Sequence, residues 1–186
     1  MMSTSTATHP GLSGMSLYVP RLRVQLEDWC RWTGAPWEKI QHVVGRSFRM
    51  PAPYEDVYTM TAQAALKLIL DCDVDPESIG YLALGTESRK DNAAGAVIVR
   101  GMLDRALEAR GLPRLSRNCE VPEIKHACLG GIYGLKGALR YVSCDGAGRR
   151  AIVLSGDVAE YARGSSGEQT QGAGAVAMLV DRHPTL

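Results

Sequence analysis

The chain has 186 residues, of which 45% are hydrophobic and 22% charged, and its formal net charge is +1. This length suits one domain with its own core and is short for two. The near-zero charge gives no reason to expect nucleic acid or a membrane surface as a partner. No apolar run approaches the roughly 18 residues of a membrane-spanning helix, so we expect no membrane segment.

The cysteines and histidines exclude further classes of protein. The five cysteines are widely spaced and contain no CxxC pair, which argues against a disulfide framework and against a zinc site. The four histidines form no HxH or HExxH pattern, so no metal site is expected. This cysteine usage suits a reducing compartment, and we predict a cytoplasmic protein.

The chain divides into one folded domain and two short ends. Residues 1–11 are rich in Ser and Thr and have no basic region followed by an apolar core, so we expect a disordered leader and not a secretory signal. Residues 12–181 are predicted to form the domain, and residues 182–186 a short tail.

The periodicity of the apolar residues predicts alternating strands and helices. In chain order, we expect a strand at 15–19, short helical segments at 26–32 and 37–44, a loop at 46–53, a helix at 55–70, a strand at 79–84, a helix at 92–109, a strand at 117–121, a helix from Cys128 to about 145, a strand at 151–154, a polar loop at 155–171 and a strand at 173–180. Alternation of this kind is typical of a mostly parallel sheet with right-handed crossovers. The predicted fold class is α/β.

Cys128 is the candidate nucleophile. A short polar approach leads into it, and two glycines and a helical apolar run follow. A thiol in the first turn of a helix faces unpaired N–H groups and the positive end of the dipole, which favour the thiolate. Gly130 and Gly131 leave space for an acyl group beside the sulfur. The alternative is a buried structural cysteine, and this pattern alone does not choose between the two.

The sequence around Cys128 resembles the 3-hydroxy-3-methylglutaryl-CoA synthase family, a branch of the thiolase-like condensing enzymes. The resemblance extends from about Leu12 to Val180, and its motifs follow the order of the family. They are Glu55-Asp56, Gly85-Thr86-Glu87-Ser88 followed by Asp91, Ala127-Cys128-Leu129-Gly130-Gly131, Ser155-Gly156-Asp157-Val158-Ala159-Glu160-Tyr161, and Gly172-Ala173-Gly174-Ala175-Val176-Ala177-Met178-Leu179.

The resemblance implies a thiolase-like half-domain, in which helices cover both faces of a five-stranded, mostly parallel mixed sheet. It implies that Cys128 accepts an acyl group from a thioester and that Glu55 acts as the general base. Glu55 and Asp56 precede a predicted helix, where acidic residues ordinarily cap the helix and complement its dipole, so the residues alone favour that simpler role.

The resemblance also implies a set of substrate-binding residues: Gly130, Gly131, Thr86, Asp157 and Tyr161. For the motifs of Thr86 and Asp157, a role as ordinary turn-forming residues is an equally good interpretation. The expected substrates are coenzyme A thioesters, and no tightly bound cofactor is expected.

In this family a second half of the same topology follows and supplies a histidine and an asparagine of the active site. The resemblance stops near Asp181, so it covers only the N-terminal half. We therefore expect a second chain that carries the other half, in a homo- or hetero-oligomer, or else a fragment of a longer synthase.

Two departures from the family pattern leave other functions open. Leu129 replaces the usual aromatic residue after the nucleophile, and Glu168-Gln169-Thr170 stands where a proline-containing stretch is common. These changes leave room for a polyketide-type or ketoacyl synthase III-like initiator with another acyl substrate. The competing class is a non-catalytic thiolase-fold subunit that binds a condensing partner or a coenzyme A ester without turnover.

Overall fold

A computed structural model of the chain describes residues 9–88, 92 and 94–186. Most of the predicted leader lies outside the described residues, as does Asp91 of the second motif. Gly11, the last residue of that predicted leader, already belongs to the first strand.

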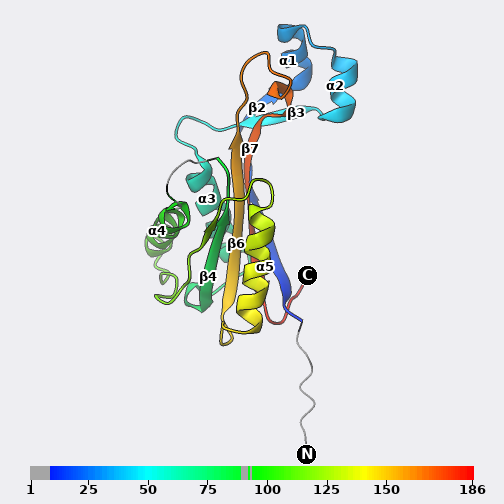
Figure 1. The fold of residues 1–186 in the computed structure, drawn as a ribbon. Helices are drawn as coiled ribbons and strands as arrows, with labels where there is room; N and C mark the ends of the chain where they lie inside the picture. Colours follow the sequence, from blue (N-terminus) through cyan, green and yellow to red (C-terminus); the bar gives the residue numbers. More distant parts are fainter. Residues whose placement is uncertain (1–8, 89–91, 93) are drawn as a thin grey trace, which may run out of the picture.

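A five-stranded sheet forms the centre of the molecule (Figure 1). Its strands, in spatial order, are β1 (Gly11–Tyr18), β7 (Gly172–Asp181), β6 (Arg150–Ala159), β4 (Ile79–Gly85) and β5 (Glu123–Ile124). The sheet is mixed, as predicted, but it is not mostly parallel. The pairings β4–β5 and β4–β6 are parallel, whereas β1–β7 and β6–β7 are antiparallel. The connection from β6 to β7 contains one 3₁₀ turn and no crossover helix, so the chain folds back and β7 runs antiparallel beside β6.

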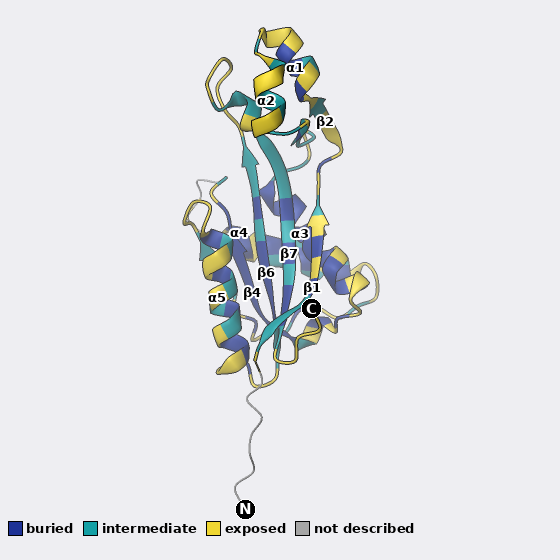
Figure 2. Ribbon diagram, turned by 90° about the vertical axis from the view of Figure 1, so that its right-hand side faces the viewer, coloured by how far each residue is buried: buried dark blue, intermediate teal, exposed yellow. Residues whose placement is uncertain are grey.

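Helices cover both faces of this sheet, as predicted (Figure 2). On one face, α3 (Val57–Asp71) packs on β1, β6 and β7, and α4 (Gly95–Glu108) packs beside it. On the other face, α5 (Gly130–Ser143) packs on β4 and β6. Each face has its own apolar cluster, and every residue of β4 is buried because helices cover it on both sides.

A smaller unit extends from one end of the sheet (Figure 1). It contains β2 (Leu22–Gln25), α1 (Leu26–Thr33), α2 (Trp37–Val43) and β3 (Ser47–Met50), and we call residues 22–50 the distal module. The loop predicted at 46–53 is corrected here, because β3 pairs with β2 in an antiparallel ribbon. Four-residue strands with partly exposed faces carry too little apolar alternation to be read from sequence.

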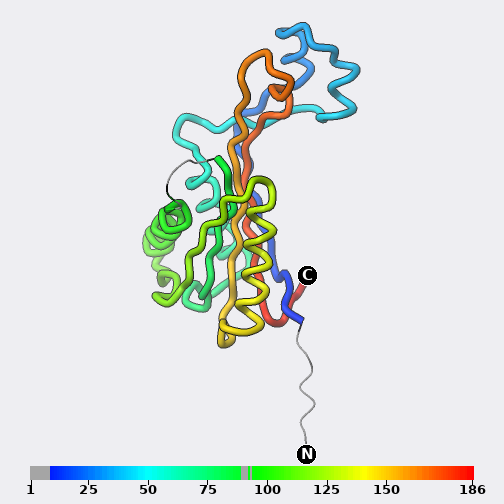
Figure 3. The backbone as a smooth tube through the Cα atoms, viewed as in Figure 1, coloured from blue at the N-terminus to red at the C-terminus, as the bar shows by residue number. Residues whose placement is uncertain are grey.

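Some predicted boundaries also shift. The strand expected at 117–121 is replaced by the two-residue β5, because Pro122 has no N–H to donate to a ladder. β6 continues through Ala159, five residues beyond the predicted strand end. The short 3₁₀ helix Glu168–Thr170 lies in the loop that follows, and Figure 3 shows that loop reaching the distal module.

Candidate active site

Cys128 lies on the turn between β5 and α5. The sequence predicted it in the first turn of the helix, but α5 begins at Gly130, so the thiol precedes the helix. The turn is closed by the Leu129 N–H, which donates to the His126 carbonyl at 2.9 Å. Ala127 has a φ of 41°, in the left-handed region that residues with a side chain seldom adopt. Such unusual backbone is concentrated at functional sites, and here it leaves Cys128 exposed.

Direct contact between backbones holds the start of α5 against the end of β4. A Cβ placed on Gly85 would lie 2.3 Å from the Gly131 nitrogen and 2.4 Å from the Gly130 carbonyl carbon. A Cβ on Gly130 would lie 2.7 Å from the Ile124 carbonyl oxygen, and a Cβ on Gly131 would lie 2.8 Å from the Ser155 Oγ. Gly130 and Gly131 are therefore required for packing, whatever further role they have toward a substrate.

Glu87 is the acidic residue that the structure brings to the thiol. Its Oε1 atom lies 4.0 Å from the Cys128 Sγ. Glu87 follows β4, and Cys128 follows β5, the parallel neighbour of β4. Parallel strands end at the same edge of a sheet, and α/β proteins commonly build their sites at that edge.

The loop that carries Glu87 is fixed by Asp157 on β6. A single oxygen of Asp157, Oδ1, accepts hydrogen bonds from the Thr86 hydroxyl at 2.9 Å, the Glu87 N–H at 2.8 Å and the Ser88 hydroxyl at 2.7 Å. Thr86 is only 1% exposed. The structure thus brings together two residues predicted to bind substrate, Thr86 and Asp157, and the contacts they make orient the Glu87 loop.

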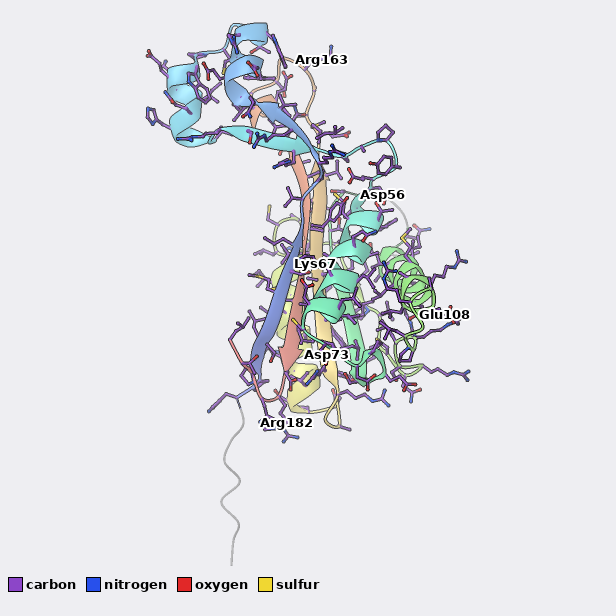
Figure 4. The ribbon with its side chains drawn as sticks, turned by 180° about the vertical axis from the view of Figure 1, so that it is seen from behind. Asp56, Lys67, Asp73, Glu108, Arg163 and Arg182 are labelled. Atoms are coloured by element: carbon purple, nitrogen blue, oxygen red, sulfur yellow. The ribbon has the colours of Figure 1, made fainter. Side chains whose placement is uncertain are left out.

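Glu55, the predicted base, makes different contacts. One carboxylate oxygen accepts a hydrogen bond from the Tyr18 hydroxyl, and the other accepts from the Ala52 N–H at 2.6 Å. The bond to Glu55 and burial raise the pKa of Tyr18 to about 12. The capping role considered for this acidic pair falls to Asp56, which caps α3 in a capping box with Thr59 and is labelled at the start of that helix in Figure 4.

Tyr161 belongs to another part of the molecule. It is 49% exposed and lines a cavity of about 1130 Å³ between the distal module and the β6–β7 loop, together with Trp29, Trp32 and Arg163. Figure 4 shows Arg163 at this end of the structure. Glu168 closes the loop over the cavity by accepting hydrogen bonds from the Gly164 N–H and the Trp29 indole, and these bonds lower the pKa of Glu168.

Sequence reasoning missed Glu87 as a site residue, although it quoted the motif that contains it. The available signal was position, because Glu87 directly follows the end of a buried strand next to the one that leads to Cys128. Glu87 and Cys128 are 41 positions apart in the chain, and sequence spacing does not give the distance between such residues in the fold. Position alone therefore could not show whether Glu87 or Glu55 lies beside the thiol.

Two features are absent from the described residues. No group of three or more His, Cys, Asp or Glu side chains that could hold a metal ion occurs in this part of the chain. Among the same residues, no helix is long and apolar enough to cross a membrane.

Comparison with known proteins identifies the family. The family model described as "Hydroxymethylglutaryl-coenzyme A synthase N terminal" matches residues 7–184. The chain belongs to the hydroxymethylglutaryl-CoA synthase family. A hydroxymethylglutaryl-CoA synthase of Haloferax volcanii is 34% identical over 183 residues, which are 96% of this chain and 40% of the relative. The predicted resemblance is thereby confirmed, and this chain corresponds to the N-terminal part of the synthases.

Solved structures of synthases show the same fold. MvaS in complex with 3-hydroxy-3-methylglutaryl coenzyme A aligns with a TM-score of 0.85 at 36% identity, over 96% of this chain and 41% of that chain. The HMG synthase of the curacin biosynthetic pathway, in complex with acetyl donor-ACP, aligns with a TM-score of 0.80 at 25% identity, over 95% and 42%. The predicted thiolase-like fold is confirmed, and the chain spans about 40% of the length of these synthases.

Proposed function

We propose that this chain carries the nucleophile half of an acyl-CoA condensing enzyme of the hydroxymethylglutaryl-CoA synthase type. The observation that supports this proposal is the exposed Cys128 thiol before α5, with the Glu87 carboxylate 4.0 Å away. In the first step, the Cys128 sulfur attacks the carbonyl carbon of acetyl-CoA. A C–S bond to Cys128 forms, the C–S bond to coenzyme A breaks, and the free coenzyme A thiol leaves with the proton.

Backbone N–H groups stabilise the negative oxygen that develops in this step. The first-turn N–H groups of a helix have no partner within the helix, and α5 begins without a side-chain cap. We assign the Cys128 N–H to this role, since it belongs to the same residue as the thiol and lies just before α5. Donors of this kind usually make the largest single contribution to acyl-transfer catalysis.

Glu87 is the proposed base for carbon–carbon bond formation. It removes a proton from the methyl carbon of the Cys128-bound acetyl group, and the carbanion adds to the carbonyl carbon of a second acyl thioester. The alkoxide that forms on that carbon takes up the proton from the Glu87 carboxylic acid. Water then hydrolyses the Cys128 thioester and releases the product. We assign this role to Glu87 and not to Glu55, because Glu87 contacts the thiol, whereas Tyr18 and Ala52 occupy the two oxygens of Glu55.

The rest of the active site comes from the other half of the family's architecture. The sheet face beside α5 exposes apolar side chains, among them Met15 and Leu17 on β1 and Ile132 and Tyr133 on α5. Monomeric soluble proteins rarely leave a contiguous face of this kind open. We propose that the C-terminal half covers it, either as a continuation of this polypeptide or as a second chain.

The acyl donor in this proposal is a coenzyme A thioester. MvaS binds 3-hydroxy-3-methylglutaryl coenzyme A, whereas the curacin synthase binds an acetyl donor-ACP, so a carrier protein is the competing donor. Tyr161 remains a proposed substrate contact, because the aromatic rings and Arg163 of its cavity offer stacking and charge to a nucleotide. The five free cysteines favour a reducing compartment, and we propose the cytoplasm.

The test follows the acetyl group on the protein purified from its native host with any polypeptide that accompanies it. After incubation with acetyl-CoA, intact mass should show one added acetyl group on the wild type and none on Cys128→Ala. In D2O, the wild type should exchange the methyl hydrogens of the bound acetyl group. Glu87→Gln should keep the adduct and lose this exchange, and Glu55→Gln should keep both.

Each outcome separates the candidate roles. Loss of exchange in Glu55→Gln, with exchange intact in Glu87→Gln, would return the base to Glu55. No adduct from acetyl-CoA but an adduct from acetylated carrier protein would identify the carrier protein as the donor. No adduct from either donor, in a sample that contains the C-terminal half, would favour the non-catalytic subunit.

A further inference from the structure

Glu123 is a buried carboxylate that the mechanism above does not use. It lies on β5, and its side chain is only 1% exposed. Its Oε2 atom accepts hydrogen bonds from the Gly95 N–H at 2.6 Å and the Ala96 N–H at 3.2 Å. The Lys125 ammonium lies 3.5 Å from its Oε1 atom. Burying a charged carboxylate is unfavourable unless its partners compensate, so the position of Glu123 requires these contacts.

Through these bonds Glu123 fixes the start of α4. The N-cap residue of α4, Ala94, has no side chain that could bond to the first-turn N–H groups. In many helices a serine or aspartate at the N-cap accepts hydrogen bonds from these N–H groups. In α4 the acceptor is Glu123, which belongs to strand β5. Gly95 is held from the other side as well, because a Cβ there would lie 2.4 Å from the ring of Tyr58. Glu123 therefore ties the start of α4, the helix that follows Glu87 in the chain, to β5.

The same residue lies just before the nucleophile. In the parallel ladder, Glu123 pairs with Leu84 and Ile124 pairs with Gly85, so β5 runs beside the last residues before the Glu87 loop. The Ile124 carbonyl oxygen lies 2.7 Å from where a Cβ of Gly130 would be, so this strand also packs against the start of α5. Glu123 thus lies on the strand that leads to Cys128 and binds the start of α4, the helix that follows Glu87 in the chain.

We propose that Glu123 is a positioning residue that sets the separation between Glu87 and Cys128. It acts through the start of α4 on one side and through β5 on the other, and it does not itself touch the thiol. This inference rests on the proposed pairing of Glu87 with Cys128. Substitution of Glu123 should increase the distance between Glu87 and Cys128 although both of these residues are still present.

The experiment measures coupling between Glu87 and Cys128 in the full chain. The rate of Cys128 alkylation by iodoacetamide is followed by peptide mass mapping at low salt, with and without Glu87→Gln. An ionised carboxylate 4.0 Å away repels a thiolate, so Glu87→Gln should speed alkylation about five-fold. In the Glu123→Ala background this ratio should fall below about two-fold, and in Glu123→Gln, which keeps one acceptor oxygen, it should be intermediate. The matched control is Glu120→Ala, an exposed carboxylate in the same segment, which should keep the full ratio.

A full ratio in Glu123→Ala would overturn the proposal. If circular dichroism shows that Glu123→Ala does not fold, the isosteric Glu123→Gln decides, and an undiminished ratio there overturns it equally. No acceleration by Glu87→Gln in the wild-type background would also overturn it, since Glu123 would then have no pair to hold. These rates require no acetyl-CoA, so they are independent of whether the acetyl adduct of the proposed function forms.

Discussion

Around Cys128, backbone packs directly on backbone, whereas the distal module is held by side chains. Gly85, Gly130 and Gly131 meet with no intervening side chain, and Asp157 fixes the adjoining loop. The distal module has a small apolar cluster whose buried residues are Leu26, Trp29, Cys30 and Phe48. A large cavity lies between this module and the β6–β7 loop, and a hydrogen bond from Trp29 to Glu168 joins the two.

The two kinds of packing have different mechanical consequences. Side chains in a small cluster can change rotamer or separate at modest cost, and regions with few buried contacts open locally. A backbone in contact with another backbone has no such freedom. We therefore expect the spacing of Glu87 and Cys128 to be rigid, while the distal module opens and closes over its cavity. The predictions below test this difference, from the largest expected effect to the smallest.

The largest effect is expected from Gly85→Ala. The new methyl group would lie 2.3 Å from the Gly131 nitrogen, and the backbone must shift to accept it. We expect the free energy of unfolding to fall by about 3 kcal/mol. Urea denaturation measures this change. Gly172→Ala is the control, because its nearest neighbour would lie 3.8 Å away, and a change within about 0.5 kcal/mol is expected. Equal losses for the two variants would contradict the comparison.

Phe48→Ala should open the distal module without unfolding the sheet. Phe48 is 7% exposed, and truncation of a buried aromatic residue costs about 3 kcal/mol. Amide hydrogen exchange should accelerate in α1 and stay unchanged in β4. Trp32→Ala is the control, since Trp32 is 74% exposed and its loss should change neither. Acceleration in β4 equal to that in α1 would show that the module and the sheet unfold as one unit.

The main helices and strands of the core could be predicted from sequence, because buried elements carry long periodic runs of apolar residues. The helix predicted at 55–70 is α3, and the strand predicted at 79–84 is β4. The direction of β7 was not predictable from its own residues. It depends on whether the loop that precedes it folds back or crosses over the sheet, and β6 continues beyond its apolar run into that loop.

Cys128 could be singled out from sequence as the candidate nucleophile, but the acidic residue beside it in the fold could not. Cys128 stands in a local pattern of glycines and helical periodicity, which a sequence displays directly. The contact with Glu87 depends on the register of β4 against β5 and on hydrogen bonds to Asp157, and these are properties of the folded chain. An acidic residue before a helix and one after a strand look equally plausible until the strands are placed.

Glu55→Gln should cause a moderate loss of stability. Glu55 accepts hydrogen bonds from Tyr18 and Ala52, and weakening them should lower the free energy of unfolding by about 1 kcal/mol at pH 7. The loss should depend on pH. The Tyr18 pKa is raised from 10.0 to about 12 in the fold, so its stabilisation is complete below pH 10 and is lost as the pH rises toward 12. Urea denaturation at several pH values measures this loss, and Tyr18→Phe should remove the same pH dependence. Unchanged dependence in both variants would refute the pairing.

The smallest effect concerns the loop over the cavity. The Gly164 N–H and the Trp29 indole lower the pKa of Glu168 below its ordinary value of 4.5. A lowered folded-state pKa means that the contribution of Glu168 is present above pH 4.5 and is lost as the pH falls through the folded value. The Trp29 indole NMR signal should therefore shift in acid, and in Glu168→Gln this titration should be absent. If the Trp29 signal still shifts with pH in Glu168→Gln, the shift is caused by another titrating group and the prediction is wrong. If the shift precedes any loss of β4 amide protection, the module opens by itself, as side-chain packing predicts.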